Sequence, residues 1–348
     1  MDAETARKSL AHFGQICEGE SPLYAMLAAR AAESAEAVEL AAGASSGQPA
    51  SNMLFGSVHF LLLSGVQGDL VRYYPSLGGS TEGAAADDIW AAFEAFFRAH
   101  SEEIRGLIGA RRVQTNEVNR CGVMLPAFCE ACAAFGDAPL QLIEVGASAG
   151  LALGLDRYRY EYDDGLIVGG ASPVVVRTAL HGPYKPPRRA LPRIADRIGV
   201  DIAPGNVLDD DGMRWQEALI WPDQMDRIER HRAAVAVMRE TPPTIIAGDG
   251  LEIAPRLALE APESVIPCVF HSHAIYQMKD AWLQEFTERL AAVGAKRDLA
   301  RVSLEWLRDD AGPRLRLTTW RGGVEKTRLL AEAHHHGRWM RWVEAQNA

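Results

Sequence analysis

The chain has 348 residues, of which 48% are hydrophobic and 24% charged, and its formal net charge is −10. These proportions are typical of a globular protein with one large or two ordinary domains. The negative charge argues against non-specific nucleic-acid binding, which needs clustered Lys and Arg. No apolar run approaches the roughly 20 residues of a membrane span, and residues 1–8 lack the apolar core of a signal peptide. The five cysteines, an odd number, favour reduced thiols. We therefore expect a cytoplasmic protein that acts on a small molecule, without nucleic-acid or membrane partners; the sequence does not predict its oligomeric state.

The first predicted domain, residues 1–135, is entirely helical. Apolar residues recur at helical spacing after Ser21, which is followed by a proline as helix starts often are. Residues 53–66 and 87–108 continue the helical pattern with large apolar side chains. The remaining residues, 136–348, form the second predicted domain, of the α/β class.

The second domain is organised around residues 140–153, Leu-Gln-Leu-Ile-Glu-Val-Gly-Ala-Ser-Ala-Gly-Leu-Ala-Leu. An apolar run suited to a central parallel strand leads into a turn of small residues and then into a predicted helix. This arrangement brings backbone N–H groups close to a nucleotide-like ligand. The turn lacks the middle glycine of G-x-G-x-x-G, which argues against a pyrophosphate-binding dinucleotide site. We interpret it as the cofactor loop of an S-adenosylmethionine-dependent methyltransferase fold.

An insertion at about residues 156–190 follows this loop. Residues 157–162 alternate in polarity, residues 163–165 predict a turn, and residues 166–168 return, which together indicate a β-hairpin. The insertion would lie over the site. Its charged and aromatic content is equally consistent with the solvated face of an edge hairpin.

Strand–helix units then resume. Four further strands are predicted at residues 194–201, 242–250, 265–276 and 300–306, and an alternating hairpin at residues 314–331 closes the sheet. Repeated strand–helix units followed by a terminal antiparallel hairpin are the pattern of a seven-stranded class I methyltransferase-like, or Rossmann-like, sheet. A dinucleotide dehydrogenase sheet usually ends in another parallel unit.

Acidic residues end three of the predicted strands: Glu144, Asp201 and Asp249. In an open α/β sheet the ligand binds beyond the carboxyl ends of the strands, where the strand order reverses. Asp201 would accept hydrogen bonds from both ribose hydroxyls and Asp249 from the adenine amine, while Glu144 would hold the loop or engage the cofactor's ammonium group. Acids also end strands simply because they are solvated there. The expected cofactor-binding residues are Glu144, Gly146, Ala147, Ser148, Gly150, Asp201, Asp249, Gly250 and His271.

His271, His273 and Tyr276 follow the fourth strand of the predicted sheet, where methyl acceptors sit in this architecture. A histidine there would deprotonate a hydroxyl or amine nucleophile as the methyl group is transferred. A packing role for the same residue is an equally good interpretation. We nevertheless take these three residues as catalytic candidates.

Two sequence patterns invite a metal-site interpretation. His334, His335 and His336 are consecutive, but neighbours on an extended chain point to alternate sides, which disfavours three ligands for one ion. Cys129 and Cys132 form a lone C-x-x-C without a second pair or spaced histidines. We therefore expect no metal site.

Several segments together resemble one bacterial family, domain-of-unknown-function family 2332. They are residues 21–24 (Ser-Pro-Leu-Tyr), 73–79 (Tyr-Tyr-Pro-Ser-Leu-Gly-Gly), 113–121 (Val-Gln-Thr-Asn-Glu-Val-Asn-Arg-Cys), 143–151 with 156–160, 221–224 (Trp-Pro-Asp-Gln), 269–272 (Val-Phe-His-Ser) and 336–339 (His-Gly-Arg-Trp). The resemblance covers nearly the whole chain, and it implies a methyltransferase-like sheet behind a helical region, with S-adenosylmethionine as cofactor. The chain departs from the family pattern at Ala152, where Asn is frequent, and so lacks a possible cofactor contact.

The resemblance also changes the interpretation of residues 112–121. Composition alone favours a helix start there, capped by Thr115 or Asn116. Because the segment belongs to the shared pattern, a role facing the site becomes the better interpretation. The expected substrate-pocket residues are Gln114, Asn116, Glu117, Arg120 and Tyr158, and Glu117 is a further catalytic candidate.

The sequence thus predicts an S-adenosylmethionine-dependent methyltransferase that acts on an unidentified small molecule. The helical region and the hairpin at 156–190 would build the acceptor pocket. The alternative is a non-catalytic binding or regulatory protein of the same fold, and a nicotinamide enzyme is a third possibility. Phe270-His-Ser-His273 stands where adenine-specific DNA methyltransferases carry Asn-Pro-Pro-Tyr, which argues against DNA methylation.

Overall fold

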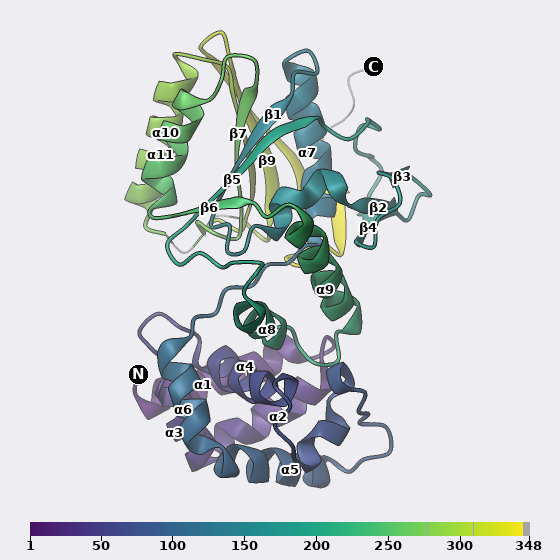
Figure 1. Cartoon of the computed structure of the whole chain (residues 1–348), viewed down its shortest axis with the longest axis vertical. Helices are drawn as coiled ribbons and strands as arrows, with labels where there is room; N and C mark the ends of the chain where they lie inside the picture. Colours follow the sequence, from purple (N-terminus) through teal and green to yellow (C-terminus); the bar gives the residue numbers. More distant parts are fainter. Residues whose placement is uncertain (277, 309, 344–348) are drawn as a thin grey trace. The chain divides into compact units, whose positions relative to one another are not determined.

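The computed structural model describes residues 1–276, 278–308 and 310–343, and the chain divides into two compact units (Figure 1). The helical unit comprises Met1–Thr115 and Asp210–Glu229, and the α/β unit comprises Asn116–Asp209 and Arg230–Ala348. This division differs from the predicted border at residue 135. The helix that was assigned to the first domain packs on the sheet, and a later segment of the chain returns to the helical unit.

The helical unit is built from short helices around one apolar core, with α4 buried on nearly all sides. Its helices are α1 (Ala3–Cys17), α2 (Pro22–Glu33), α3 (Ala35–Ala42), α4 (Ala50–Leu63), η1 (Asp69–Tyr73), η2 (Pro75–Leu77), α5 (Ala86–Ala99), α6 (Ser101–Ala110) and α8 (Asp210–Ala218). The side chain of Ser21 caps α2 by accepting a hydrogen bond from Tyr24 N at 3.3 Å, as the sequence predicts. Phe13, Tyr24, Phe55 and Trp221 pack together in the core, with ring centroids 4.8–6.0 Å apart in the contacting pairs.

The α/β unit contains a single mixed sheet. Its strands are β1 (Leu140–Val145), β2 (Arg159–Tyr162), β3 (Ile167–Val168), β4 (Val175–His181), β5 (Ile194–Asp201), β6 (Thr244–Ala247), β7 (Ile266–Ser272), β8 (Leu299–Glu305), β9 (Arg314–Arg321), β10 (Val324–Ala333) and β11 (Trp339–Trp342). Their order is β3-β2-β4-β11-β10-β9-β8-β7-β1-β5-β6. The predicted α/β class is confirmed, whereas the predicted number of seven strands is wrong: the described residues form eleven.

The helices of this unit are α7 (Arg120–Ala134), α10 (Gly250–Glu260), α11 (Asp280–Gly294) and the 3-10 helix η3 (Leu151–Arg157). Helix α9 (Met225–Glu240) begins in the helical unit and ends in the α/β unit. Figure 1 shows α10 and α11 side by side on one face of the sheet. Successive residues of β7 alternate between faces: Val269 joins the core cluster of α10 and α11, while Phe270 meets Phe128 of α7 with ring centroids 5.2 Å apart.

Strand β1 is buried along its whole length and pairs in parallel with β5 on one side and β7 on the other. The chain continues outward from β5 to β6 and from β7 to β8, again in parallel. The strand order therefore reverses at β1, and its carboxyl end is the point where open α/β sheets bind ligands.

The remaining strands were only partly predicted. The terminal hairpin β9–β10 and the hairpin β2–β3 are confirmed as antiparallel pairs. The insertion does not stand apart from the sheet: β2 pairs with β4, and β4 pairs with β11, which was not predicted. Pairings between residues so far apart in sequence, such as Ala179 with Trp339, leave no local signal. Among the described residues, none of the helices combines the length and the apolar character needed to cross a membrane.

Candidate functional site

The carboxyl ends of β1, β5 and β7 bring the polar residues of the α/β unit to one edge of the sheet. Glu144 of β1 lies level with Gly199 of β5 and Phe270 of β7. The loop after β1, the loop after β5 and the loop after β7 therefore leave the sheet at this same edge. Strand β8 runs parallel to β7, with Leu304 level with Ser272, so Glu305 at the end of β8 lies at the same edge.

The loop Gly146–Gly150 is held by hydrogen bonds within the protein. Gly146 N and Ala147 N donate to Val200 O at 2.9 and 3.3 Å, Ser148 N donates to Asp201 Oδ2 at 2.8 Å, and Gly150 N donates to Ala147 O at 2.7 Å. These four N–H groups are thus not directed at a ligand, contrary to the reason for which the loop was predicted to bind one. The 3-10 helix that follows is also a weaker dipole source than the predicted α-helix.

Backbone geometry explains the small residues of this loop. Gly146 and Gly150 both have φ +74°, and Ser148 has φ +52°, which is unusual for a residue with a side chain. A Cβ at position 146 would lie 2.5 Å from Cβ of Ala274, in the loop after β7. The glycine therefore allows the loops after β1 and β7 to touch.

Glu144 is the central acid of the site. It is 5% exposed, and its Oε2 is buried without a hydrogen-bond partner among the described residues. Burial, with a further contribution from the Asp201 charge, raises its pKa well above the usual value for glutamate. Burial thus favours the protonated form of Glu144, whereas a cationic group placed beside it would favour the ionised form.

Two further buried acids lie around Glu144. Asp201 is 7% exposed and accepts hydrogen bonds from Ser148 N and Ala203 N, both at 2.8 Å. Glu117 is 8% exposed, and one oxygen lies 3.8 Å from the guanidinium of Arg230. Glu144 and Glu117 both raise the pKa of the buried thiol of Cys121, after desolvation as the main cause. The three acids thus gather around the start of α7 and the end of β1, and Arg230 is a neighbour that the sequence did not indicate.

Asn119 and Arg120 connect the start of α7 to three separate parts of the sheet. Asn119 Nδ2 donates to Arg177 O at 2.8 Å and to Gly337 O at 2.9 Å, and its Oδ1 accepts from Arg177 N at 3.1 Å. Arg120 donates to the carbonyl oxygens of His335 at 2.8 Å and Ser272 at 3.4 Å. These contacts position the segment that carries Glu117.

We predict that Asn119→Ala destabilises the α/β unit by about 2–4 kcal/mol. The substitution removes three hydrogen bonds, two with the partly buried backbone of Arg177 and one of the two that Gly337 O accepts. Each lost bond costs about 0.5–1.5 kcal/mol. Urea denaturation followed by circular dichroism measures the change. Asn206→Ala, in the loop after β5, is the control. A loss in Asn119→Ala no larger than in this control would contradict the anchoring role.

His271, a catalytic and cofactor-binding candidate, lies in a closed network. It has no exposed surface; Nδ1 is 2.7 Å from Oε1 of Glu305, and Nε2 is 3.0 Å from Nε of Arg301. The guanidinium can only donate, so Nε2 accepts and Nδ1 carries the proton that is donated to Glu305. Burial lowers the pKa of His271. With both ring nitrogens engaged, this arrangement favours the packing interpretation over a base.

His273 and Tyr276 follow β7 with their rings 5.9 Å apart. His273 has φ +50°, and its buried Nε2 has no hydrogen-bond partner among the described residues. Burial, together with the neighbouring Arg120 and His335, lowers its pKa to about 3. It is therefore a neutral imidazole and a weak base. Tyr276 is 42% exposed.

The other predicted residues fall in different places. Asn116 donates from Nδ2 to Ala147 O at 3.3 Å, which links it to the loop, whereas Gln114 belongs to the helical unit. Tyr158 is 1% exposed and its hydroxyl donates to Leu151 O, so it stabilises η3 rather than facing a pocket.

Asp249 is exposed and caps α10 by accepting from Leu251 N at 2.8 Å. Gly250 lies against Val145, where a Cβ would be 2.6 Å from Cγ1.

A hollow of about 340 Å³ adjoins the loop. It is lined by Ala149, Pro204, Gly205, Asn206, Val207, Pro243 and Ile245. Ile245 of β6 lies level with Gly199 of β5, and Gly199 lies level with Glu144 of β1. The side chains of Ile245 and Glu144 therefore lie on the same face of the sheet, two strands or roughly 10 Å apart. The size of the hollow is within the range of small-molecule sites.

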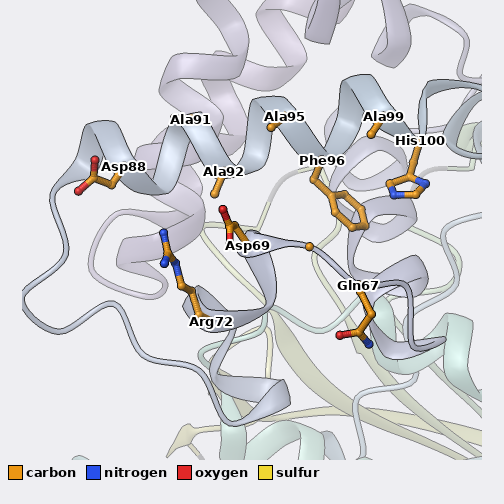
Figure 2. A pocket seen from close by; sticks show the side chains of 11 residues that line it. Gln67, Asp69, Arg72, Asp88, Ala91, Ala92, Ala95, Phe96, Ala99 and His100 are labelled. Atoms are coloured by element: carbon orange, nitrogen blue, oxygen red, sulfur yellow. The ribbon is translucent and has the colours of Figure 1, made fainter.

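A second hollow, of about 370 Å³, lies in the helical unit between α5 and the loop before η1 (Figure 2). Small side chains of α5 (Ala91, Ala95 and Ala99) line one side, and Asp69 and Arg72 face them. Both charged residues are exposed, and the hollow contains none of the predicted site residues. It therefore gives no indication of chemistry.

The three consecutive histidines differ from the sequence prediction. Residues 334–338 are not an extended strand but the turn between β10 and β11, so the argument from alternating side chains does not apply. One ring nitrogen of each histidine lies within 4.8 Å of the others. The cysteines give no such cluster: all five are free and buried.

Comparisons with known proteins agree with the resemblance seen in the sequence. No curated protein and no solved structure matches the chain significantly. One family model, described as "Uncharacterized protein conserved in bacteria (DUF2332)", matches residues 7–342. The match spans both units and all of the site residues described above. The chain therefore belongs to this family of uncharacterised bacterial proteins.

Proposed function

We propose that the α/β unit binds S-adenosylmethionine at the carboxyl end of β1 and transfers its methyl group to a small molecule. The observation that carries this proposal is Glu144, a buried carboxyl group with an unpartnered oxygen at the point where the strand order reverses. A buried polar atom without a partner is costly to the fold, and such costs are retained where they serve binding.

The charge of the site favours a cation over a phosphate. Glu117, Glu144 and Asp201 are all more than nine-tenths buried, and four of the five N–H groups of the loop Gly146–Gly150 donate within the protein rather than to a phosphate. S-adenosylmethionine carries an ammonium group and a sulfonium, and the ammonium would donate to Oε2 of Glu144. The same features argue against a pyrophosphate-containing nicotinamide cofactor.

The hollow beside the loop would take the adenosine part of the cofactor. It lies on the same face of the sheet as Glu144, and Asn206 is the polar side chain in its lining. Asp201, which holds the loop through Ser148 N and the next turn through Ala203 N, would accept from the ribose hydroxyls as a carboxylate with two oxygens. Asp249, exposed at the start of α10, is the weakest of the assigned contacts.

Methyl transfer here would depend on alignment rather than on a strong base. His271 has both ring nitrogens engaged, and the lowered pKa of His273 makes it a weak proton acceptor. Holding the acceptor in line with the methyl group supplies much of the rate enhancement in such a reaction. The acceptor would therefore be a nucleophile that needs little activation at neutral pH, such as a thiolate, or one that loses its proton directly to water.

Isothermal titration of the full chain with S-adenosylmethionine and S-adenosylhomocysteine tests the proposal. We expect both to bind with one site per chain, and we expect NADH not to bind. Failure of folded protein to bind either cofactor would refute the proposal.

Because both ring nitrogens of His271 already have hydrogen-bond partners, a second candidate function is also favoured. It is a binding or regulatory protein that holds the cofactor without turnover. A screen of thiol, amine, hydroxyl and carboxylate acceptors with radiolabelled cofactor separates the two. Label transfer to any acceptor supports the enzyme. Binding without transfer across all four classes supports the second candidate.

A further inference from the structure

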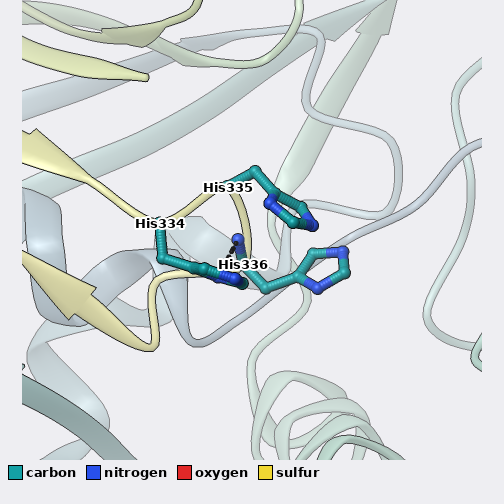
Figure 3. A group of neighbouring side chains, drawn as sticks. All are labelled: His334, His335 and His336. Carbon is teal, nitrogen blue, oxygen red and sulfur yellow. Dashed lines mark hydrogen bonds between the residues drawn. The ribbon is translucent and has the colours of Figure 1, made fainter. Parts of the chain in front are cut away.

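The turn between β10 and β11 holds three imidazole rings on the same side of the chain (Figure 3). The ring of His335 lies between its neighbours, with centroids 4.3 Å from His334 and 4.0 Å from His336. One nitrogen from each ring lies within 4.8 Å of the other two. We propose that His334, His335 and His336 bind a divalent transition-metal ion of the zinc type. This inference does not depend on the proposed cofactor.

The backbone of the turn is fixed by side chains from outside it. Arg120 donates to His335 O at 2.8 Å, and Gly337 O accepts from Asn119 Nδ2 at 2.9 Å and from Thr178 Oγ1 at 3.0 Å. Gly337 has φ +74°, and a Cβ there would lie 2.4 Å from Asn119 O. The histidines are thus presented by a preorganised turn, which lowers the entropic cost of binding an ion.

The geometry requires only a small closure of the rings. Zinc binds imidazole nitrogen at about 2.0–2.1 Å, so the nitrogens of a tetrahedral site are about 3.3 Å apart. Because the three nitrogens lie within 4.8 Å of one another, each pair would have to approach by at most about 1.5 Å, which side-chain rotations provide. His334 also has to give up one contact, because its Nδ1 accepts a hydrogen bond from His336 N at 3.1 Å (Figure 3). If Nδ1 binds the ion, its lone pair is no longer available to His336 N. If Nε2 binds the ion, Nδ1 carries the ring proton and cannot accept.

The surroundings indicate what would complete the site. Three neutral imidazoles leave the ion its full positive charge and an open fourth position, as in catalytic rather than structural zinc sites. Arg120 is close enough to His335 to donate to its carbonyl oxygen and adds a second positive charge. An anionic fourth ligand, either hydroxide from water or a carboxylate, therefore fits the site better than a neutral one.

Metal titration of the full chain, first stripped with EDTA, tests this site. We expect calorimetry to show one Zn²⁺ per chain, and Co²⁺ to give the visible absorption of a four-coordinate ion. His335→Asn and His336→Gln should each reduce the affinity for Zn²⁺ at least tenfold. His12→Gln, on the exposed face of α1, should leave this affinity unchanged. Circular dichroism establishes that each variant is folded; if one is not, the other provides the test. Unchanged affinity in a folded variant would overturn the proposal.

Adjacent histidines bind metal ions weakly in any chain, so the role of the turn needs its own control. A peptide with the sequence of residues 332–340 carries the same ligands without the fold. We expect the protein to bind Zn²⁺ at least tenfold more tightly than the peptide. Thr178→Val keeps all three histidines but removes a donor to Gly337 O, and should weaken binding severalfold. Equal affinities of protein and peptide would overturn the proposal.

Discussion

Glu305→Ala should destabilise the α/β unit by about 3–5 kcal/mol, because it removes the charged acceptor of two buried hydrogen bonds, each worth about 1.5–3 kcal/mol. Glu305 has no exposed surface, and its Oε1 accepts from His271 Nδ1 at 2.7 Å and from Ala274 N at 3.1 Å. Arg301 completes the network by donating to His271 Nε2, and burial already lowers its pKa to about 10. Without the carboxylate, His271 Nδ1 and Ala274 N lose their acceptor, and the guanidinium loses one of its neighbouring negative charges.

Two further variants separate the charge from the shape of Glu305. Glu305→Gln keeps an oxygen that accepts from His271 and removes the charge, so its loss should fall between wild type and Glu305→Ala. Glu288→Ala, on the exposed face of α11, should change stability by no more than about 0.5 kcal/mol. Because the chain has two units, hydrogen exchange of peptides covering β7 and β8 is the better readout than a single melting curve. Equal exchange in Glu305→Ala and Glu288→Ala would contradict the prediction.

The sequence predicts the parallel half of the sheet well because its signals are local. Strands β1, β6 and β7 are short, mainly apolar runs bounded by turn residues, β5 and β8 mix apolar residues with a few charged ones, and the hairpin β9–β10 alternates in polarity around a Gly-Gly turn. A strand buried on both faces is apolar at successive positions, and a strand buried on one face alternates in polarity. Both patterns are visible within a few neighbouring residues of the sequence. The order of the strands, by contrast, depends on contacts between distant segments. Nothing near Trp339 indicates that it pairs with Ala179.

The candidate site shows the same limit. The acids at the ends of β1 and β5 were identified from their positions, because the carboxyl ends of parallel strands share one edge. Whether a residue there faces a ligand depends on partners far away in the chain. The position of His271 in the sequence is suitable for a base, but its two ring nitrogens form hydrogen bonds with Arg301 and Glu305, which lie some thirty residues later in the chain. The turn at residues 334–338 depends equally on Asn119 and Thr178.

Glu144→Gln should weaken S-adenosylmethionine binding by about 10–100-fold, which corresponds to a charged hydrogen bond of about 1.5–3 kcal/mol. The raised pKa of Glu144 sets the sign of the pH dependence. In the protein without ligand the raised pKa favours the protonated carboxyl group, and a bound ammonium group favours the ionised form, so binding releases protons. The affinity of the wild type should therefore increase with pH above the usual pKa range of glutamate, by up to tenfold per pH unit, and that of Glu144→Gln should not.

Calorimetry in buffers of different ionisation enthalpy measures the proton released on binding. Methylthioadenosine, which lacks the ammonium group, is the matched ligand and should bind the wild type and Glu144→Gln equally. The variant is also expected to fold well. Because the pKa of Glu144 is raised in the native state, only the unfolded chain ionises readily above about pH 4.5, and the carboxyl group costs stability as pH increases. Glutamine removes this cost, so Glu144→Gln should be more stable than the wild type at pH 8 and equally stable at pH 4. Equal pH dependence of cofactor binding in both proteins would exclude Glu144 as the group that receives the ammonium.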